Sequence, residues 1–216
     1  ILTFGSGSAV STTVSASVDG TYVVRLTAVD TAGNSNYSEF ALIWDTAAPV
    51  LASQTTFPNP WYNVDQTSTF TYTDATSGIV SGTPVSCVIN TEGTNQTCSV
   101  TPNVCDAAGN CNTTLVTSNT VNLDKSLPIV DAGTDKIINA SYTQDATVNS
   151  SISGTASYAW TMTSGPGVIT FGTPAAEDTT VSANTDGSYV IRLTVTDNAG
   201  NVAFDEFNLL WDTVAP

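Results

Sequence analysis

The chain contains two copies of one long segment, and this repeat constrains its fold more than any other feature. Residues 1–49 align with residues 168–216 without a gap, and more than half of the aligned positions are identical. Both copies end on nearly the same phrase, "WDTAAP" and "WDTVAP". Self-similarity at a fixed spacing is typical of proteins built from tandem modules. Residues 1–49 are therefore expected to be the C-terminal half of a module whose complete copy is residues 129–216.

A different module is predicted between the two copies, over residues 50–128. It carries "DAAGN" where the copies carry "DTAGN" and "DNAGN", and it ends on "LDKSLP". Each module end thus places an aspartate shortly before a proline, in the pairs Asp45 and Pro49, Asp124 and Pro128, and Asp212 and Pro216. Proline fixes its own φ and keeps the preceding residue extended, so the linkers between modules are expected to be short and stiff.

Each module is expected to be all-β. Tyr189, Ile191, Leu193 and Val195 recur with a period of two, which places them on one face of a strand. The turn "DNAGN" then reverses the chain into a second strand over residues 202–211. About seven short strands per module, with Trp160 in the core, indicate a β-sandwich. The fold class predicted is tandem immunoglobulin-like Greek-key β-sandwiches arranged as an extended rod.

The composition excludes several functions. Four Lys and Arg residues stand against nineteen Asp and Glu residues, which gives a net charge of −15, and histidine is absent. Four scattered basic residues cannot form the patch that nucleic acids or anionic membranes require. No apolar stretch approaches the ~20 residues of a membrane helix, so no membrane insertion is expected.

The same composition argues against catalysis. Without histidine the chain lacks the commonest general base, and no carboxylate pair stands out by its spacing. We therefore predict that the protein is not an enzyme. The negative net charge is compatible with binding of divalent cations. In the alternative interpretation it only keeps an exported protein soluble. No signal peptide begins at Ile1, so the chain is expected to start partway through a longer protein.

Three stretches of the last module carry a family resemblance: "VDAGTDKIINAS", "YAWTMTSGPGVITF" and "DGSYVIRLTVTDNAGN". They resemble the PKD-like immunoglobulin-type repeats of giant bacterial surface proteins. One departure is that "WTMTSGPG" replaces the aromatic-aspartate-glycine signature of the narrower PKD group. The middle module, through "YTDATSGI" and "VCDAAGNC", resembles other bacterial immunoglobulin-like repeats. The resemblance implies extracellular stalks and adhesins, and it carries over no catalytic residue.

All four cysteines lie in the middle module, at Cys87, Cys98, Cys105 and Cys111. Cys105 and Cys111 flank the turn "DAAGN", and Cys87 and Cys98 flank a reversal at Gly93. These local pairs are favoured over the other two pairings. The alternatives are free thiols and a four-cysteine zinc site, whose usual spacings of two to four residues are not matched. Disulfides would place the protein in an oxidising compartment, outside the cell.

Linker and turn aspartates are candidate calcium ligands, because calcium takes six to eight oxygen ligands that two modules can supply together. The candidates are Asp30, Asp45 and Asp74 at the first-to-middle junction, and Asp124, Asp131 and Asp135, with Asp106 reaching over, at the middle-to-last junction. In the alternative interpretation Asp30, Asp106 and Asp197 only cap their own turns and the linker aspartates are solvated. No cofactor is required; calcium is the one candidate.

The predicted function is a structural, adhesive stalk segment of a large repetitive extracellular protein, whose partners are neighbouring repeats of the same protein. One alternative is a subunit of a fibre or surface layer, because a half module exposes a sheet that upstream chain or another copy must cover. Another is a carbohydrate-binding accessory module of a secreted enzyme, with Trp61 and Tyr62 as candidates. Trp44 and Trp211 are placed either between modules or in the cores. Glycosylation sequons occur at Asn36, Asn95, Asn112, Asn139 and Asn149.

Overall fold

The chain consists of β-strands and loops, as predicted. The computed structural model describes residues 1–216 and contains no helix, so no helical segment suited to crossing a membrane is present. The residues form two compact units. The first comprises Ile1–Thr56, Thr67–Val88 and Thr97–Asn119, and the second comprises Phe57–Gln66, Ile89–Gln96 and Thr120–Pro216. Residues 50–128 contribute to both units, and the division into three modules stays a prediction.

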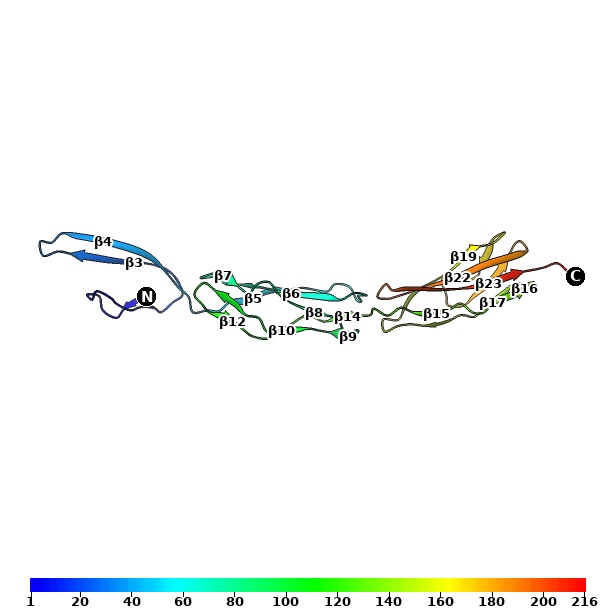
Figure 1. Ribbon diagram of the computed structural model, residues 1–216, viewed down its shortest axis with the longest axis horizontal. Helices are drawn as coiled ribbons and strands as arrows, with labels where there is room; N and C mark the ends of the chain where they lie inside the picture. The colour runs from blue at the N-terminus through cyan, green and yellow to red at the C-terminus, as the bar shows by residue number, and fades with distance from the viewer. The chain divides into compact units, whose positions relative to one another are not determined.

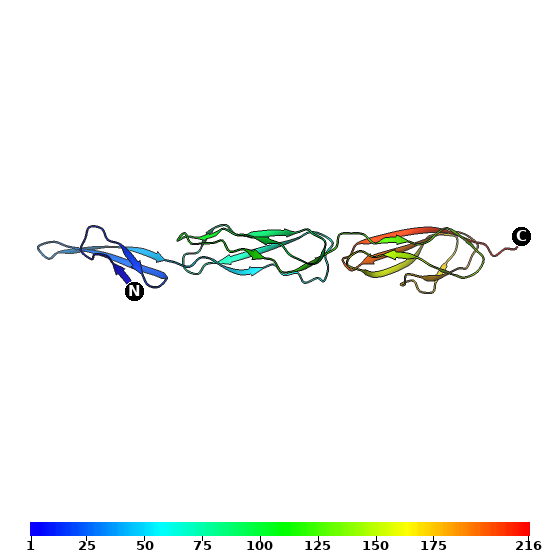
Figure 2. The ribbon, with the colours of Figure 1, turned by 90° about the horizontal axis from the view of Figure 1, so that it is seen from below.

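The end of the chain folds into a β-sandwich within the second unit (Figures 1 and 2). One sheet has the order β16-β23-β22-β19, and a facing sheet has the order β17-β21-β20, with β15 and β18 paired beside them. These strands are β15 (Ile129–Asp131), β16 (Lys136–Ile138), β17 (Tyr142–Gln144), β18 (Thr147–Asn149), β19 (Thr155–Ser164), β20 (Ile169–Phe171), β21 (Thr179–Ala183), β22 (Gly187–Asp197) and β23 (Val202–Trp211). They outnumber the seven expected because several stretches are divided into strands of only three residues.

The core of this sandwich follows the predicted alternation. Tyr189, Ile191, Leu193 and Val195 of β22 are at most 1% exposed, because their common face packs on the opposite sheet. Trp160 of β19 is 3% exposed, with its ring stacked on Phe171 and edge-on to Phe207. The predicted core position of Trp160 is therefore confirmed.

The sequence repeat is also a repeat of structure. In the first unit, β3 (Gly20–Val29) pairs with β4 (Ser35–Trp44) from Gly20 opposite Trp44 to Val29 opposite Ser35. β22 and β23 pair in the same register, from Gly187 opposite Trp211 to Thr196 opposite Val202. The short pair β1 (Leu2–Phe4) and β2 (Val14–Ala16) likewise repeats the register of β20 and β21.

The hairpin turn is fixed by one glycine. Gly33 has φ +89° and its counterpart Gly200 has φ +90°, and Gly109 in the middle turn has φ +93°. A side chain in this left-handed region is strained, so the fourth position of the motif Asp-Xaa-Ala-Gly-Asn needs glycine. One motif therefore gives the same turn three times.

The first unit also contains a smaller core, whose buried residues are Phe70, Tyr72 and Val104. β5-β6-β8 and β12-β11-β7 form three-stranded sheets, and β10 pairs with β13 (Figure 1). In the second unit β9 pairs with β14. These strands are β5 (Val50–Gln54), β6 (Gln66–Thr73), β7 (Ile79–Ser81), β8 (Val85–Ile89), β9 (Gly93–Gln96), β10 (Ser99–Val100), β11 (Val104–Asp106), β12 (Cys111–Asn112), β13 (Val116–Thr117) and β14 (Val121–Leu123).

The two copies differ in what covers them. β22 lies between β23 and β19, whereas β3 has β4 as its single neighbour. Leu26 is therefore 68% exposed while its counterpart Leu193 is 0% exposed, and Phe40 is 55% exposed while Phe207 is 2% exposed. The same residue in the same hairpin is thus buried in one copy and open to solvent in the other.

This contrast predicts opposite outcomes for one substitution. Leu193→Ala leaves a cavity in a filled core and should lower the free energy of unfolding by about 2–5 kcal/mol. Leu26→Ala removes an exposed side chain and should change it by less than about 0.5 kcal/mol. Urea denaturation of the two variants measures the difference. Equal losses would show that a further segment covers Leu26 in solution.

Candidate functional site

The three linker aspartates, Asp45, Asp124 and Asp212, share one local structure. In each, carboxylate Oδ1 accepts a hydrogen bond from the backbone N–H two residues later, at 3.0, 3.2 and 3.1 Å. Aspartate forms such side-chain turns readily, and the bond fixes the direction in which the linker leaves the module. The linker is therefore shaped before it meets any partner.

The three turn aspartates each cap their own turn. The asparagine that ends the motif donates its backbone N–H to aspartate Oδ1 and its side-chain Nδ2 to Oδ2, all within 2.8–2.9 Å, in the pairs Asp30 and Asn34, Asp106 and Asn110, and Asp197 and Asn201. The side-chain bond from Asn34 is the largest cause that lowers the pKa of Asp30 below its ordinary value of 3.8. The predicted capping role is present in all three turns.

Two of these turns also hold a linker. Asn110 Nδ2 donates to the main-chain carbonyl of Asp45 at 3.1 Å, and Asn201 Nδ2 donates to the main-chain carbonyl of Asp124 at 2.9 Å. A side-chain amide has two N–H donors, so one proton caps the turn and the other holds the linker. We call this arrangement the linker–turn contact.

The first linker site gathers three carboxylates. Oxygens of Asp45, Asp74 and Asp106 lie within 4.8 Å of one another. Asp45 Oδ2 also accepts from the backbone N–H and the hydroxyl of Ser77, at 3.1 and 2.5 Å. The ion pairs of the chain join Arg25 to Glu39, Lys125 to Asp65 and Arg192 to Glu206, so none of them neutralises this cluster.

Asp74 is held as an anion by the loop that follows it. The N–H groups of Thr76, Ser77 and Gly78 donate to Asp74 Oδ1 at 3.1, 2.9 and 2.9 Å. The bond from Gly78 is the largest cause that lowers the pKa of Asp74 below its ordinary value of 3.8. A negative charge at this position is therefore stabilised locally, next to two further carboxylates.

The second linker site has a serine hydroxyl beside its two aspartates and no third carboxylate. Ser151 Oγ lies 2.6 Å from Asp124 Oδ2 and 2.9 Å from Asp197 Oδ2, so a hydroxyl bridges the linker aspartate and the turn aspartate. The backbone N–H of Ser153 donates to Asp124 Oδ2 at 2.7 Å. Burial raises the pKa of Asp124, but the bonds from Ser151 and Ser153 outweigh it, so the pKa of Asp124 lies below 3.8. In this site neutral N–H and O–H donors stabilise the ionised carboxylate of Asp124.

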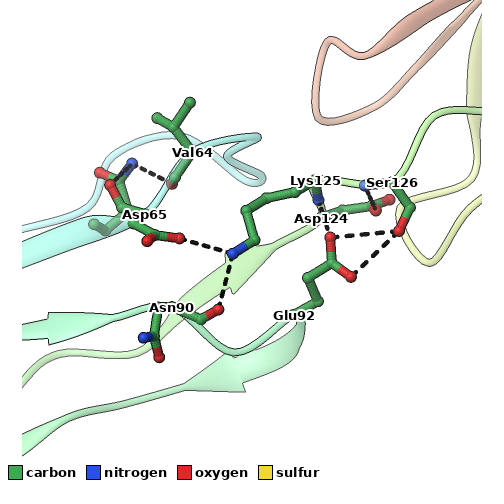
Figure 3. A network of polar contacts seen from close by, with 8 residues as sticks. Val64, Asp65, Asn90, Glu92, Asp124, Lys125 and Ser126 are labelled. Atoms are coloured by element: carbon green, nitrogen blue, oxygen red, sulfur yellow. Dashed lines mark hydrogen bonds and ion pairs between the residues drawn. The ribbon is translucent and has the colours of Figure 1, made fainter.

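Residues after Asp124 are clamped as well (Figure 3). Lys125 Nζ donates to Asp65 Oδ1 at 2.8 Å and to the carbonyl of Asn90 at 3.0 Å. Glu92 accepts from the backbone N–H of Lys125 at 2.5 Å and from the hydroxyl of Ser126 at 3.2 and 3.4 Å. The linker is therefore held by side chains of the second unit before it enters the sandwich.

The predicted ligands do not all assemble. Asp106 lies with Asp45 and Asp74, not with Asp124 as the sequence suggested. Asp30 caps a turn at the far end of the hairpin β3–β4. Asp131 is not part of the carboxylate cluster, and its Oδ1 accepts a hydrogen bond from the N–H of Gly133 at 2.9 Å. Asp135 accepts from the backbone and side chain of Asn208, chiefly the backbone N–H, which lowers its pKa below 3.8.

Sequence reasoning missed the neutral members of both sites. Ser77, Ser153, Asn110 and Asn201 hold the linkers, although only carboxylates were considered as candidates. A signal was present, because Ser-Gly occurs just before β7 and again just before β19. The backbone carbonyl of each of these glycines accepts from the turn, from Ala107 at 3.0 Å and from Asn198 at 2.9 Å.

Disulfides join Cys105 to Cys111 and Cys87 to Cys98, the pairs that the spacing favours. Cys105 and Cys111 lie opposite each other in the register of β11 and β12, so their bond closes the turn that carries Asp106 and Asn110. The turn of the first linker site is thus covalently closed, whereas the turn of the second is closed by hydrogen bonds without a disulfide.

The aromatic residues considered as candidates for carbohydrate binding or for the seams between modules are packed against other parts of the fold. Trp211 is 6% exposed and belongs to the sandwich core, and Trp44 is half-buried. Trp61 and Tyr62 are half-buried, and the ring of Tyr62 packs edge-on against Phe57. They do not form an exposed flat strip.

Comparisons with known proteins agree with the resemblance in the last module. Residues 132–210 match the family model of a PKD domain, which confirms the PKD-like character of this part of the chain. A comparison with curated proteins found no match.

Among solved structures, the PKD domain from the KIAA 1837 protein is 28% identical, with a TM-score of 0.35, over 40% of this chain and 89% of that one. A Ca²⁺-stabilised adhesin with which an Antarctic bacterium binds ice is 14% identical, with a TM-score of 0.38, over 89% of this chain and 56% of that one. A 1.5-MDa bacterial ice-binding adhesin is 16% identical, with a TM-score of 0.35, over 90% of this chain and 76% of that one.

The lowered pKa of Asp124 predicts a pH dependence. A carboxyl whose folded pKa is depressed stabilises the fold above its unfolded pKa, and this contribution is lost as pH falls through the folded pKa. Asp124→Asn should lower the melting temperature at pH 7 and flatten its decline below about pH 4, because the variant has no carboxylate to protonate. Thermal melts from pH 2 to pH 7 measure this. Asp212→Asn is the matched control; an equal effect there would contradict the role of Ser151 and Ser153.

Proposed function

We propose that this chain is a stiff spacer segment of a large, repetitive, extracellular surface protein of the adhesive type, without enzymatic activity. The single observation that carries the proposal is that two different linkers are held by the same linker–turn contact. A spacer must limit bending where one module passes into the next, and that is where these bonds lie. The PKD match over residues 132–210 and the two disulfides support a surface location.

The modules are also suited to bearing tension. β16 pairs in parallel with the C-terminal strand β23, from Lys136 opposite Leu209 to Ile138 opposite Trp211, so a pull on the two ends of the sandwich loads these lateral backbone bonds together. Disulfides shorten the segment of the middle module that force can extend. Proline at the end of each linker restricts the backbone there. Function in this proposal is reach and resistance to extension.

Calcium at the first linker site is the second part of the proposal. Three carboxylates share a small volume without a basic side chain, which is costly unless a cation or proton is bound. In the second linker site there are two carboxylates rather than three, and the Ser151 hydroxyl lies between them, with one proton to donate to either. Carboxylate and carbonyl oxygens are the ligands that calcium prefers, with water completing its shell. Asp45, Asp74 and Asp106 would hold the ion, and the second linker site would not require one.

Calcium should therefore raise the melting temperature. A ligand at 100 times its Kd stabilises by about 2.7 kcal/mol. Asp74→Ser should abolish the calcium response, because it removes one of the three clustered carboxylates. It also removes the acceptor of three backbone N–H bonds and should lower the melting temperature in EDTA, so the calcium response is read as the difference between calcium and EDTA within each protein. Ser151→Asp should create a calcium response at the second site. Calorimetry with calcium and with EDTA measures all three proteins, and an EDTA-insensitive wild type would exclude calcium.

Single-molecule extension tests the spacer role. Pulling should unfold the chain in separate steps. Reduction should lengthen the extension of the middle module by roughly 6 nm, because the disulfides span 11 and 6 residues and extended chain measures ~3.5 Å per residue. One cooperative event for the whole chain would contradict a string of independent modules. Sedimentation as fibres at the same concentration would favour the fibre-forming alternative, for which the open face of β3 and β4 is the supporting observation.

A further inference from the structure

The turn at Asp30–Asn34 has the conformation of the two turns that hold linkers. Asn34 donates its backbone N–H and Nδ2 to the two carboxylate oxygens of Asp30, both at 2.8 Å, and Asp30 N–H donates to the carbonyl of Asn34 at 2.9 Å. The corresponding backbone bonds in the other turns measure 3.1 Å at Asp106 and 3.0 Å at Asp197. With Gly33 at φ +89°, this turn agrees with that at Asp197–Asn201 in each of these bonds and also in the bond from the alanine N–H to aspartate Oδ1, at 2.9 Å in both.

One difference sets this turn apart. The second amide proton of Asn110 and of Asn201 goes to the carbonyl of a linker aspartate, but Asn34 Nδ2 donates to Asp30 alone. The residues of the turn are exposed. Asn34 is thus oriented by the same bonds that orient the other two, with one donor left over.

We propose that the turn at Asp30–Asn34 is a docking site for a proline-ended aspartate linker of the Leu123–Pro128 kind, which Asn34 holds by the main-chain carbonyl of its aspartate. We infer this kind of linker from the sequence counterpart of the turn. Asp197–Asn201 corresponds to Asp30–Asn34, and its asparagine holds the linker that contains Asp124. The docking requires neither bound calcium nor a mechanical role.

The partner lies in the same polypeptide as the turn. Each linker–turn contact adds one hydrogen bond worth about 1 kcal/mol, which cannot hold two separate molecules together. Covalent attachment supplies an effective concentration in the millimolar range or above, which makes such a bond sufficient. The linker aspartate also needs N–H and hydroxyl donors such as Ser151 and Ser153, so the partner segment has to bring a serine loop with it. Residues 121–167 contain both the linker and that loop.

The test is an extended chain in which a second copy of residues 121–167 precedes Ile1. Residue 168 corresponds to residue 1, so this extension continues the module in register. A crystal structure of the extended chain should show Asn34 Nδ2 about 3 Å from the carbonyl of the added linker aspartate. If that structure shows a completed module in which Asn34 Nδ2 does not bind the linker carbonyl, the docking proposal is wrong. The spacer proposal would not be affected by this result.

A matched pair of substitutions gives a second readout. In the 216-residue chain, Asn34→Ala should lower the melting temperature less than Asn201→Ala, because Asn201 loses two side-chain bonds and Asn34 loses one. In the extended chain the two substitutions should have equal effects, with roughly 4–8 °C lost for each bond. An Asn34→Ala effect that the extension leaves unchanged would contradict the proposal. If sedimentation shows that the unextended chain forms a dimer that Asn34→Ala abolishes, the partner lies in another molecule. That result would contradict a partner in the same polypeptide.

Discussion

The two N–H donors of one side-chain amide are the constraint on which the linkers depend. Asparagine at the end of the turn uses one proton to close the turn on its own aspartate and the other to hold a linker carbonyl. Serine or aspartate at this place would offer at most one donor, and glutamine would place its amide one carbon farther away. The turn and the linker are therefore coupled, since a turn that opened would release the linker as well.

The two linker sites solve the same electrostatic problem in different ways. Both bring a linker carboxylate next to a turn carboxylate, which is unfavourable in the absence of a donor or cation between them. Ser151 supplies a hydroxyl in one site, whereas Asp74 adds a third negative charge in the other. Both linker aspartates accept from a serine hydroxyl, so the sites differ in the number of carboxylates, which is three around Asp45 and two around Asp124. Two neighbouring linkers can then differ in their response to calcium although their backbone contacts are the same.

The hairpins and their turns could be predicted from the sequence because both are determined locally. Alternation from Tyr189 to Val195 and the glycine of the turn specify the strands and the reversal, and nearby cysteines favour nearby pairs. The burial of individual residues could not be predicted from the sequence in the same way. Leu26 and Leu193 have the same sequence surroundings and differ only in which strands lie beside them. The grouping of aspartates was missed for a related reason. Asp30 and Asp45 are separated by the ten-residue strand β4, about 34 Å at ~3.4 Å per residue, so a turn and the linker of its own module lie at opposite ends. Each linker aspartate instead contacts an asparagine much farther along the chain, 65 residues away for Asp45 and 77 for Asp124, which sequence proximity does not reveal.

The asparagine side chain binds the main chain of the linker, not one of its side chains. The acceptor is the peptide oxygen of Asp45 or Asp124, and every amino acid presents the same oxygen. The residues that follow can therefore diverge, as Thr-Ala-Ala and Lys-Ser-Leu have done, without altering the grip. The side chains that make this contact all lie in the five-residue turn motif, so a linker of different sequence can form the same hydrogen bond as long as its peptide oxygen reaches the asparagine.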